Sequence, residues 1–387
     1  MKYNFDEKVK REGTNCIKYD SRGNVFGNGE VLPLWVADMD FKTPEFIIDA
    51  LKKRLEHEIL GYSFRPDSYF EAIINWVKRR HGWDIKKEWL SFSPGVVAGL
   101  TLAIETFSDP EDEVILQPPV YTPFFDSIRM TRRTLVENPL KKVGGRYTFD
   151  LDDLKRKITG KTRLLLLSNP QNPGGMVWKR EELKALTDIC LEHKIFIISD
   201  EIHSDLIFKG NKHIPLPMLS DDVAQNCVVC MAPSKTFNVA GLTTSFLVIP
   251  NKRHFISYER TLRIPHLHMG NLFGNISLEA AYNHGDDWLE QLIEYLSGNY
   301  LFLENFLKEN LAGAIPMKAE ATYLVWIDFS AYGLSDDELN NKILSAGVGL
   351  NRGIHFGTQG TGFMRMNIGC TRAMLKDALE RIAAVFN

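Results

Sequence analysis

The sequence predicts an α/β protein, with a mainly parallel sheet between two helical layers and a smaller α+β unit after it. Three observations lead to this fold class. Short apolar runs alternate with amphipathic helical segments from about residue 43 to residue 285. Several runs are apolar on both faces, which is typical of strands in a buried parallel sheet. After residue 285 the pattern changes to a long helix and isolated strands, so we expect a second unit over residues 286–387.

Periodicity and capping signals predict the elements of the first unit, residues 43–285. Thr43 and Pro44 favour the start of a helix whose apolar face continues to Ile59. Further helices are expected over residues 96–107 and 181–193. Strands are expected over residues 113–116, 163–168, 195–199, 227–231 and 245–249. Because ligands of such sheets bind beyond the carboxyl ends of the strands, the residues that follow each strand are the candidates for a site.

The second unit begins with a helical stretch to residue 311. Strands over 322–327 and 363–368, a helix over 336–346 and a final helix from Arg372 follow. Residues 1–42 have no clear period, and we expect them to pack on the smaller unit or on a second subunit. Four glycines between residues 353 and 362 lack the spacing of a dinucleotide-binding turn, so we expect a flexible loop there.

Composition excludes several classes of protein. The chain has 387 residues, 44% hydrophobic and 25% charged, which is ordinary for a globular protein and excludes disordered and fibrous chains. A net charge of −3 provides no general attraction to nucleic acid or to anionic membranes. The apolar runs are far shorter than the ~20 residues of a membrane-spanning helix, and residues 1–10 lack the apolar core of a secretion signal. We therefore expect a cytoplasmic protein that acts on small molecules.

Five cysteines make a disulfide framework improbable. Cys227 and Cys230 have the spacing of a redox pair, but residues three apart on a strand point to opposite faces. We interpret them as buried thiols of a core strand.

Polar residues follow several predicted strands. Lys235 comes after the strand at 227–231, Asp200 ends another, and Asn172 lies in a turn after a third. Taken singly, each has an ordinary interpretation as a solvated lysine, a helix cap and a turn residue. Tyr121 follows a fourth strand and is a ring-stacking candidate or a core tyrosine. The start of the helix at Val96 and Val97, with the hydroxyl of Ser234, suits a phosphate group.

The combination is more specific than its members. A lysine for a Schiff base, a carboxylate for a ring nitrogen, an amide for a ring oxygen, an aromatic for the ring face and a helix start for a phosphate are the needs of pyridoxal 5′-phosphate (PLP). The sequence therefore predicts a PLP site with no metal.

At these residues the chain resembles the fold-type I, class I/II aminotransferase-like PLP enzymes, and within them the MalY/PatB group of cystathionine β-lyases, or C–S lyases. The resemblance covers nearly the whole chain. Its motifs include residues 11–14, 32–41, 61–63, 168–175, 198–203 and 363–370. It implies a PLP-dependent transferase fold with a seven-stranded large-domain sheet, and a homodimer.

The resemblance also implies residue roles. Lys235 would bind PLP covalently and act as the catalytic base. Arg365 would bind the substrate α-carboxylate, and Tyr62 would reach the phosphate in the neighbouring subunit. The remaining cofactor-binding positions would be Val96, Val97, Tyr121, Asn172, Asp200, His203 and Ser234.

One position departs from the pattern of many aminotransferases. Thr243 and Thr244 follow Gly241-Leu242, where those enzymes have a phosphate-binding arginine. This favours β-elimination from cystathionine or a related cysteine S-conjugate. The alternatives are a class I/II aminotransferase and, in another class, a PLP-bound regulatory or interaction protein.

Overall fold

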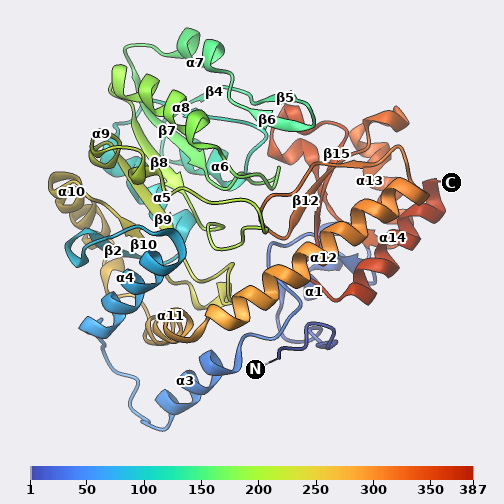
Figure 1. Ribbon diagram of the computed structural model, residues 1–387, viewed down its shortest axis with the longest axis horizontal. Coiled ribbons are helices and arrows are strands. Elements are labelled where there is room, and N and C mark those ends of the chain that lie inside the picture. The colour runs from blue at the N-terminus through green and yellow to red at the C-terminus, as the bar shows by residue number, and fades with distance from the viewer. Residues whose placement is uncertain (1, 387) are drawn as a thin grey trace.

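Two sheets and one long helix that runs beside both organise the chain. The computed structural model describes residues 2–386. Figure 1 shows the larger sheet with its helices on one side and the smaller sheet on the other, with α12 (Asp286–Asn310) running beside both. Among residues 2–386, no helix is long and apolar enough to cross a membrane.

The larger sheet has seven strands, as the resemblance implies. Their order is β2-β10-β9-β8-β7-β3-β4. β10 runs antiparallel to both of its neighbours, and the pairs from β9 to β4 are parallel. The strands are β2 (Leu90–Ser93), β3 (Glu113–Leu116), β4 (Thr134–Glu137), β7 (Thr162–Ser168), β8 (Phe196–Asp200), β9 (Cys227–Met231) and β10 (Ser245–Val248). The mainly parallel sheet is thus confirmed.

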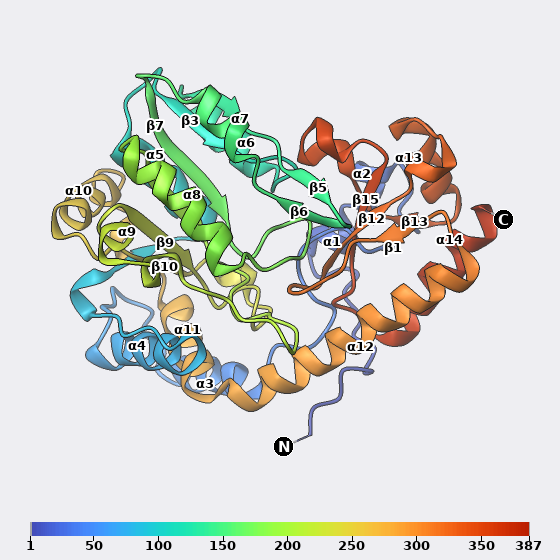
Figure 2. The same ribbon diagram turned by 45° about the horizontal axis from the view of Figure 1, so that its top comes forward.

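Helices cover both faces of this sheet (Figure 2). One face packs on α5 (Val96–Phe107), α6 (Pro123–Met130) and α10 (Lys252–Arg263). The other face packs on α7 (Leu151–Lys157) and α8 (Arg180–Glu192), with α9 (Asp221–Gln225) beside them. Cys227 and Cys230 belong to the two different cores and are free, buried thiols, as predicted.

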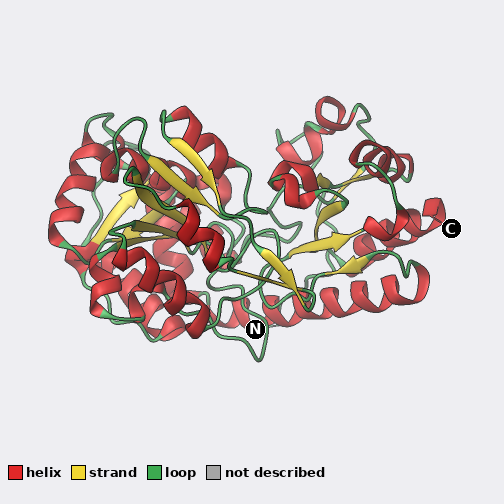
Figure 3. Ribbon diagram, turned by 90° about the horizontal axis from the view of Figure 1, so that it is seen from above, coloured by secondary structure: helices red, strands yellow, loops and turns green. Residues whose placement is uncertain are grey.

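A third core joins the two sheets. It contains α3 (Glu45–Leu55), α4 (Asp67–His81), α11 (Leu272–His284), α12 and α14 (Arg372–Phe386). The smaller, antiparallel sheet has the order β11-β12-β15-β14, with α13 (Asp336–Ser345) nearby (Figure 1). Figure 3 shows the strands of the two sheets in yellow as two separate groups. Its strands are β11 (Ile315–Pro316), β12 (Leu324–Asp328), β14 (Asn351–Arg352) and β15 (Phe363–Asn367).

The N-terminal residues pack against the smaller sheet region. After the short helices α1 (Ile17–Asp20) and α2 (Arg22–Phe26), β1 (Leu32–Pro33) pairs in parallel with β13 (Val348–Gly349). A separate hairpin is formed by β5 (Lys141–Val143) and β6 (Arg146–Thr148).

Two expectations were wrong. The helix predicted from Thr43 to Ile59 is α3, which begins at Glu45 and ends at Leu55, so Ile59 lies outside it and is 68% exposed. Thr43 does not cap this helix, because its hydroxyl donates to the carbonyl of Asn238. The glycines at 353–362 are tightly packed: a Cβ at Gly360 would lie 1.9 Å from the carbonyl oxygen of Gly353.

Candidate active site

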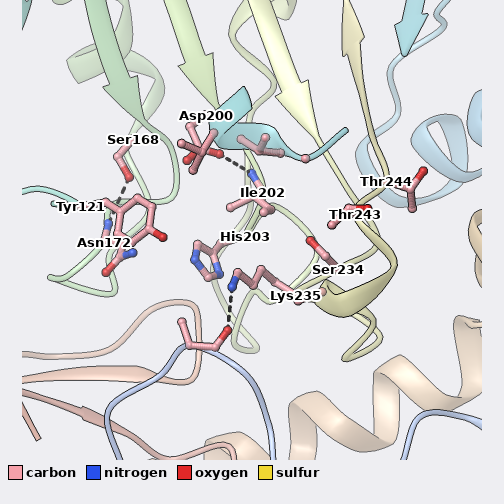
Figure 4. A pocket seen from close by; sticks show the side chains of 15 residues that line it. Tyr121, Ser168, Asn172, Asp200, Ile202, His203, Ser234, Lys235, Thr243 and Thr244 are labelled. Atoms are coloured by element: carbon pink, nitrogen blue, oxygen red, sulfur yellow. Dashed lines mark hydrogen bonds between the residues drawn. The ribbon is translucent and has the colours of Figure 1, made fainter. Parts of the chain in front are cut away.

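One pocket collects most of the predicted site residues. It lies where β3, β7, β8 and β9 end, as expected for a parallel sheet. Figure 4 shows Lys235 and His203 in its centre, Tyr121 and Asn172 on one side, and Ser234 and two threonines on the other. The residues that line the pocket are Ala37, Gly95, Val96, Val97, Tyr121, Ser168, Asn172, Asp200, Ile202, His203, Ser234, Lys235, Ala240, Thr243 and Thr244.

Lys235 and Asp200 are groups of opposite charge type, and both are poorly solvated in this pocket. The Lys235 amino group donates to the carbonyl of Ala37 at 2.7 Å. Desolvation lowers the pKa of Lys235 to about 8, against the opposing effect of the Asp38 charge. Desolvation also raises the pKa of Asp200 to about 7, and the only hydrogen bond to its carboxylate within residues 2–386 comes from the backbone N–H of Ile202 at 3.0 Å. The neighbouring groups therefore do not fully offset the desolvation of either the Lys235 ammonium or the Asp200 carboxylate.

Arg365, in β15 of the smaller sheet, does not line the pocket itself but contacts Asn172, which does. Its guanidinium donates to the side-chain oxygens of Asn172 at 3.0 Å and Asn351 at 2.8 Å, and to the carbonyl of Trp35 at 3.2 Å. It also lies 4.8 Å from the ring centre of Phe356. The side chain is 4% exposed, and burial lowers its pKa to about 10. Since these acceptors are neutral, the guanidinium is a buried cation that suits an anionic ligand.

Aromatic and imidazole rings complete this side of the pocket. Burial raises the pKa of Tyr121, while the positive charge of Arg365 opposes that rise. His203 is 4% exposed, and its Nδ1 has no hydrogen-bond partner among residues 2–386. Burial, assisted by the charges of Lys235 and Arg365, lowers the pKa of His203 to about 3. His203 is therefore a neutral imidazole at physiological pH.

The other side of the pocket is built by the start of α5. Gly95 is the N-cap, with φ of 114°, and no side chain caps the helix. The first N–H groups of a helix have no intrahelical acceptor, so those at Val96 and Val97 are available to an anion. Ser234, Thr243 and Thr244 place hydroxyl-bearing side chains at the same pocket.

Sequence reasoning misses part of this pocket. In the sequence, Thr243 and Thr244 stand out only because an arginine is absent there, whereas the structure places both in the lining. Ala37 lies in the motif at residues 32–41, but its side chain does not indicate its role, because its contribution is a backbone carbonyl. Tyr62, in contrast, is fully exposed between α3 and α4 and does not line the pocket of this chain.

Comparison with known proteins decides the family. The family model of aminotransferase class I and II matches residues 29–382. The chain belongs to the class I and II aminotransferase family. It is 45% identical over 386 residues to cystathionine β-lyase PatB of Bacillus subtilis (strain 168), covering 99% of this chain and all of the relative.

Two solved structures are also similar to this chain. Cystalysin from Treponema denticola, which contains PLP, is 32% identical with a TM-score of 0.97, covering 100% of this chain and 99% of the other. The PLP-bound C–S lyase from Staphylococcus hominis is 35% identical with a TM-score of 0.93, covering 100% and 98%. The family resemblance found in the sequence is thus confirmed.

Proposed function

We propose that this protein is a PLP-dependent C–S β-lyase that cleaves L-cystathionine or a related cysteine S-conjugate to a thiol, pyruvate and ammonia. One observation carries the proposal. A single pocket joins the amino group of Lys235, the buried carboxylate of Asp200 and a helix start, and the buried guanidinium of Arg365 bonds to Asn172 in its lining. The relatives named as cystathionine β-lyase and C–S lyase support the same activity.

The pocket residues fit PLP. The buried Asp200 carboxylate, whose pKa burial raises, would be stabilised by a cationic ring nitrogen. Asn172 would donate to the ring oxygen, Tyr121 would cover the ring, and His203 would lie beside it as a neutral imidazole. The N–H groups of Val96 and Val97, with the hydroxyl of Ser234, would hold the phosphate. Lys235 would hold the aldehyde carbon covalently.

Arg365 would orient the substrate. An amino-acid carboxylate supplies the negative charge that the neutral acceptors around its guanidinium do not. Its planar fork suits bidentate binding of a carboxylate. Arg365 bonds to Asn172, which lines the pocket together with Lys235, so a carboxylate bound by Arg365 would bring the substrate amine and Cα toward the lysine.

Lys235 would move the proton. When bound, PLP supplies an electron-accepting ring that stabilises negative charge at Cα. Burial lowers the pKa of Lys235 to about 8, which favours the neutral amine that a general base requires. Its Nζ, freed when the substrate amine takes its place at the aldehyde carbon, would take the proton from Cα. The Cβ–S bond would then break, and the sulfur would leave with the electron pair as a thiolate. Water then hydrolyses the released three-carbon enamine to pyruvate and ammonia.

The exposed arm between α3 and α4 supports a homodimer. Tyr62 is fully exposed in the single chain, and Ile59, Leu60 and Phe64 are 68%, 57% and 82% exposed. Large apolar side chains gathered on one segment mark an interaction site. A second copy of the chain would cover this arm, and Tyr62 would then reach the phosphate of the neighbouring pocket.

The test is incubation with PLP and L-cystathionine in the absence of a keto acid. We expect equal amounts of thiol and pyruvate, together with an absorbance band from bound cofactor. Lys235→Ala should abolish both, whereas Lys209→Ala, at an exposed lysine, should leave both unchanged. Amino transfer that needs an added keto acid, without thiol release, would instead assign an aminotransferase. A binding partner that survives Lys235→Ala, with no turnover by the wild type, would assign a regulatory protein.

A further inference from the structure

Residues 35–41, which we call the carbonyl segment, lie between Lys235 and Arg365. The segment contains no helix or strand. Most of its backbone oxygens accept hydrogen bonds from side chains, and the carbonyl of Val36 also accepts from the backbone N–H of Asp38. Side chains therefore determine much of its conformation. The acceptor–donor pairs are Trp35 with Arg365, Val36 with Asn367, Ala37 with Lys235 and Tyr323, Asp38 with Lys18 and Asn367, Met39 with Arg11 and Asn238, and Phe41 with Asn238.

This segment connects the two charged groups of the proposed reaction. The carbonyl of Ala37 accepts from the Lys235 amino group at 2.7 Å. Two residues earlier, the carbonyl of Trp35 accepts from Arg365 at 3.2 Å. A shift of the segment would therefore move the acceptors of the proposed base and of the proposed carboxylate-binding residue together.

Arg11 makes a dense set of contacts with the segment. Its two terminal nitrogens donate to both carboxylate oxygens of Asp38, at 3.0 and 2.7 Å. One of them also donates to the carbonyl of Met39 at 3.1 Å and to the Asp40 carboxylate at 2.7 Å. A planar guanidinium fork thus holds three consecutive residues, a geometry that a lysine cannot reproduce.

The charges of this contact are balanced and poorly solvated. Lys18 is fully buried and donates to the Asp40 carboxylate at 2.7 Å. Arg11 and Lys18 therefore offset Asp38 and Asp40. Removing one cation would leave a poorly solvated carboxylate without its partner, and this costs more than losing an exposed pair.

We propose that Arg11 is a positioning residue for the lyase reaction, because it fixes residues 38–40 and so holds the carbonyls of Ala37 and Trp35 against Lys235 and Arg365. The inference rests on the proposed function. Arg11 lies in one of the motifs that carry the family resemblance, and its partners Asp38 and Asp40 lie in another. Arg11 itself does not line the pocket.

The experiment compares Arg11→Met and Arg11→Lys with Arg22→Met in the PLP-loaded protein. Arg22 is the matched control: it belongs to the same N-terminal region, but its guanidinium donates to the carbonyls of Tyr19 and Val31 outside the segment. Steady-state pyruvate formation gives kcat and KM. The pH midpoint of the cofactor absorbance reports the environment of Lys235, which faces the charges of Asp38, Asp200 and Arg365. Thermal unfolding reports stability.

We expect Arg11→Met to lower kcat by roughly tenfold or more, the scale of a lost charge-assisted hydrogen bond. The unpaired Asp38 should favour the protonated Lys235 nitrogen and move the absorbance midpoint upward, by about half a pH unit. Arg11→Lys should recover the midpoint, because the charge is kept, but only part of kcat, because the fork is lost. Arg22→Met should change neither.

A purely structural Arg11 would lower the melting temperature without moving kcat per loaded site or the absorbance midpoint, and that result would overturn the proposal. If Arg11→Met does not fold, Arg11→Lys decides alone: wild-type kcat in that variant would overturn it. Absence of pyruvate from the wild type would refute the proposed function, whereas a normal wild type with an unaffected Arg11→Lys would refute only the positioning role.

Discussion

Replacing Asp200 by asparagine tests the electrostatics of the pocket in the protein without cofactor. Asparagine has nearly the same shape but does not ionise. Burial raises the pKa of Asp200 from 3.8 to about 7 in the folded chain. The folded state therefore holds this proton more tightly than the unfolded state does.

The sign and the size of the effect follow. Because the folded pKa is raised, the favourable contribution of Asp200 is complete below about pH 4 and is lost as the pH rises to about 7. At about 1.4 kcal/mol per pKa unit, the loss amounts to about 4 kcal/mol, of which about 3 kcal/mol falls between pH 5 and pH 8. The unfolding free energy of Asp200→Asn should thus rise relative to wild type by about 3 kcal/mol over that interval.

The assay is chemical denaturation of both apoproteins at several pH values between 5 and 8. Other titrating groups are common to the two proteins, so the difference isolates Asp200. Added PLP should reverse the order, since its cationic ring nitrogen would stabilise the carboxylate but not the amide. A difference that stays constant with pH, or one that moves in favour of the wild type, would refute burial as the cause of the raised pKa.

Three further predictions concern other residues. Arg365→Lys should raise KM for L-cystathionine by roughly 10- to 100-fold in steady-state pyruvate assays, since the planar fork is lost; an unchanged KM would contradict carboxylate binding. Mixing Tyr62→Ala with Lys235→Ala should restore activity that neither variant has alone, because a mixed dimer contains one intact site; no recovery would argue against a role across subunits. In the native protein a thiol reagent should label Cys16 only, since Cys190, Cys227, Cys230 and Cys370 are buried with raised pKa values, and all five should react after unfolding.

Several elements are predictable because their signals are local. The strands β3 and β9 and the helix α5 have the predicted bounds, since each combines a clear period with turn residues at its ends. Two strands of the larger sheet, β2 and β4, have no such signal. In β4 no residue is fully buried, and β2 alternates with serines, one of which, Ser91, donates to Glu259. Edge strands of this kind lack the continuous apolar run that identifies the others.

Part of the candidate site can also be predicted from the sequence. In a parallel sheet, chain direction alone brings the ends of the strands to one edge, so the sequence is enough to group Asp200, Asn172 and Lys235. The order of residues along the chain does not predict which backbone oxygen accepts a hydrogen bond from which side chain. The contact of Ala37 with Lys235, the fork of Arg11 and the bond from Arg365 to Asn172 join residues far apart in sequence. Only the tertiary structure decides them: the N-terminal segment packs between Lys235 and Arg365, and the smaller sheet brings Arg365 to the turn that contains Asn172. The backbone carbonyls of the segment are the same in every residue, so they leave no mark in the sequence.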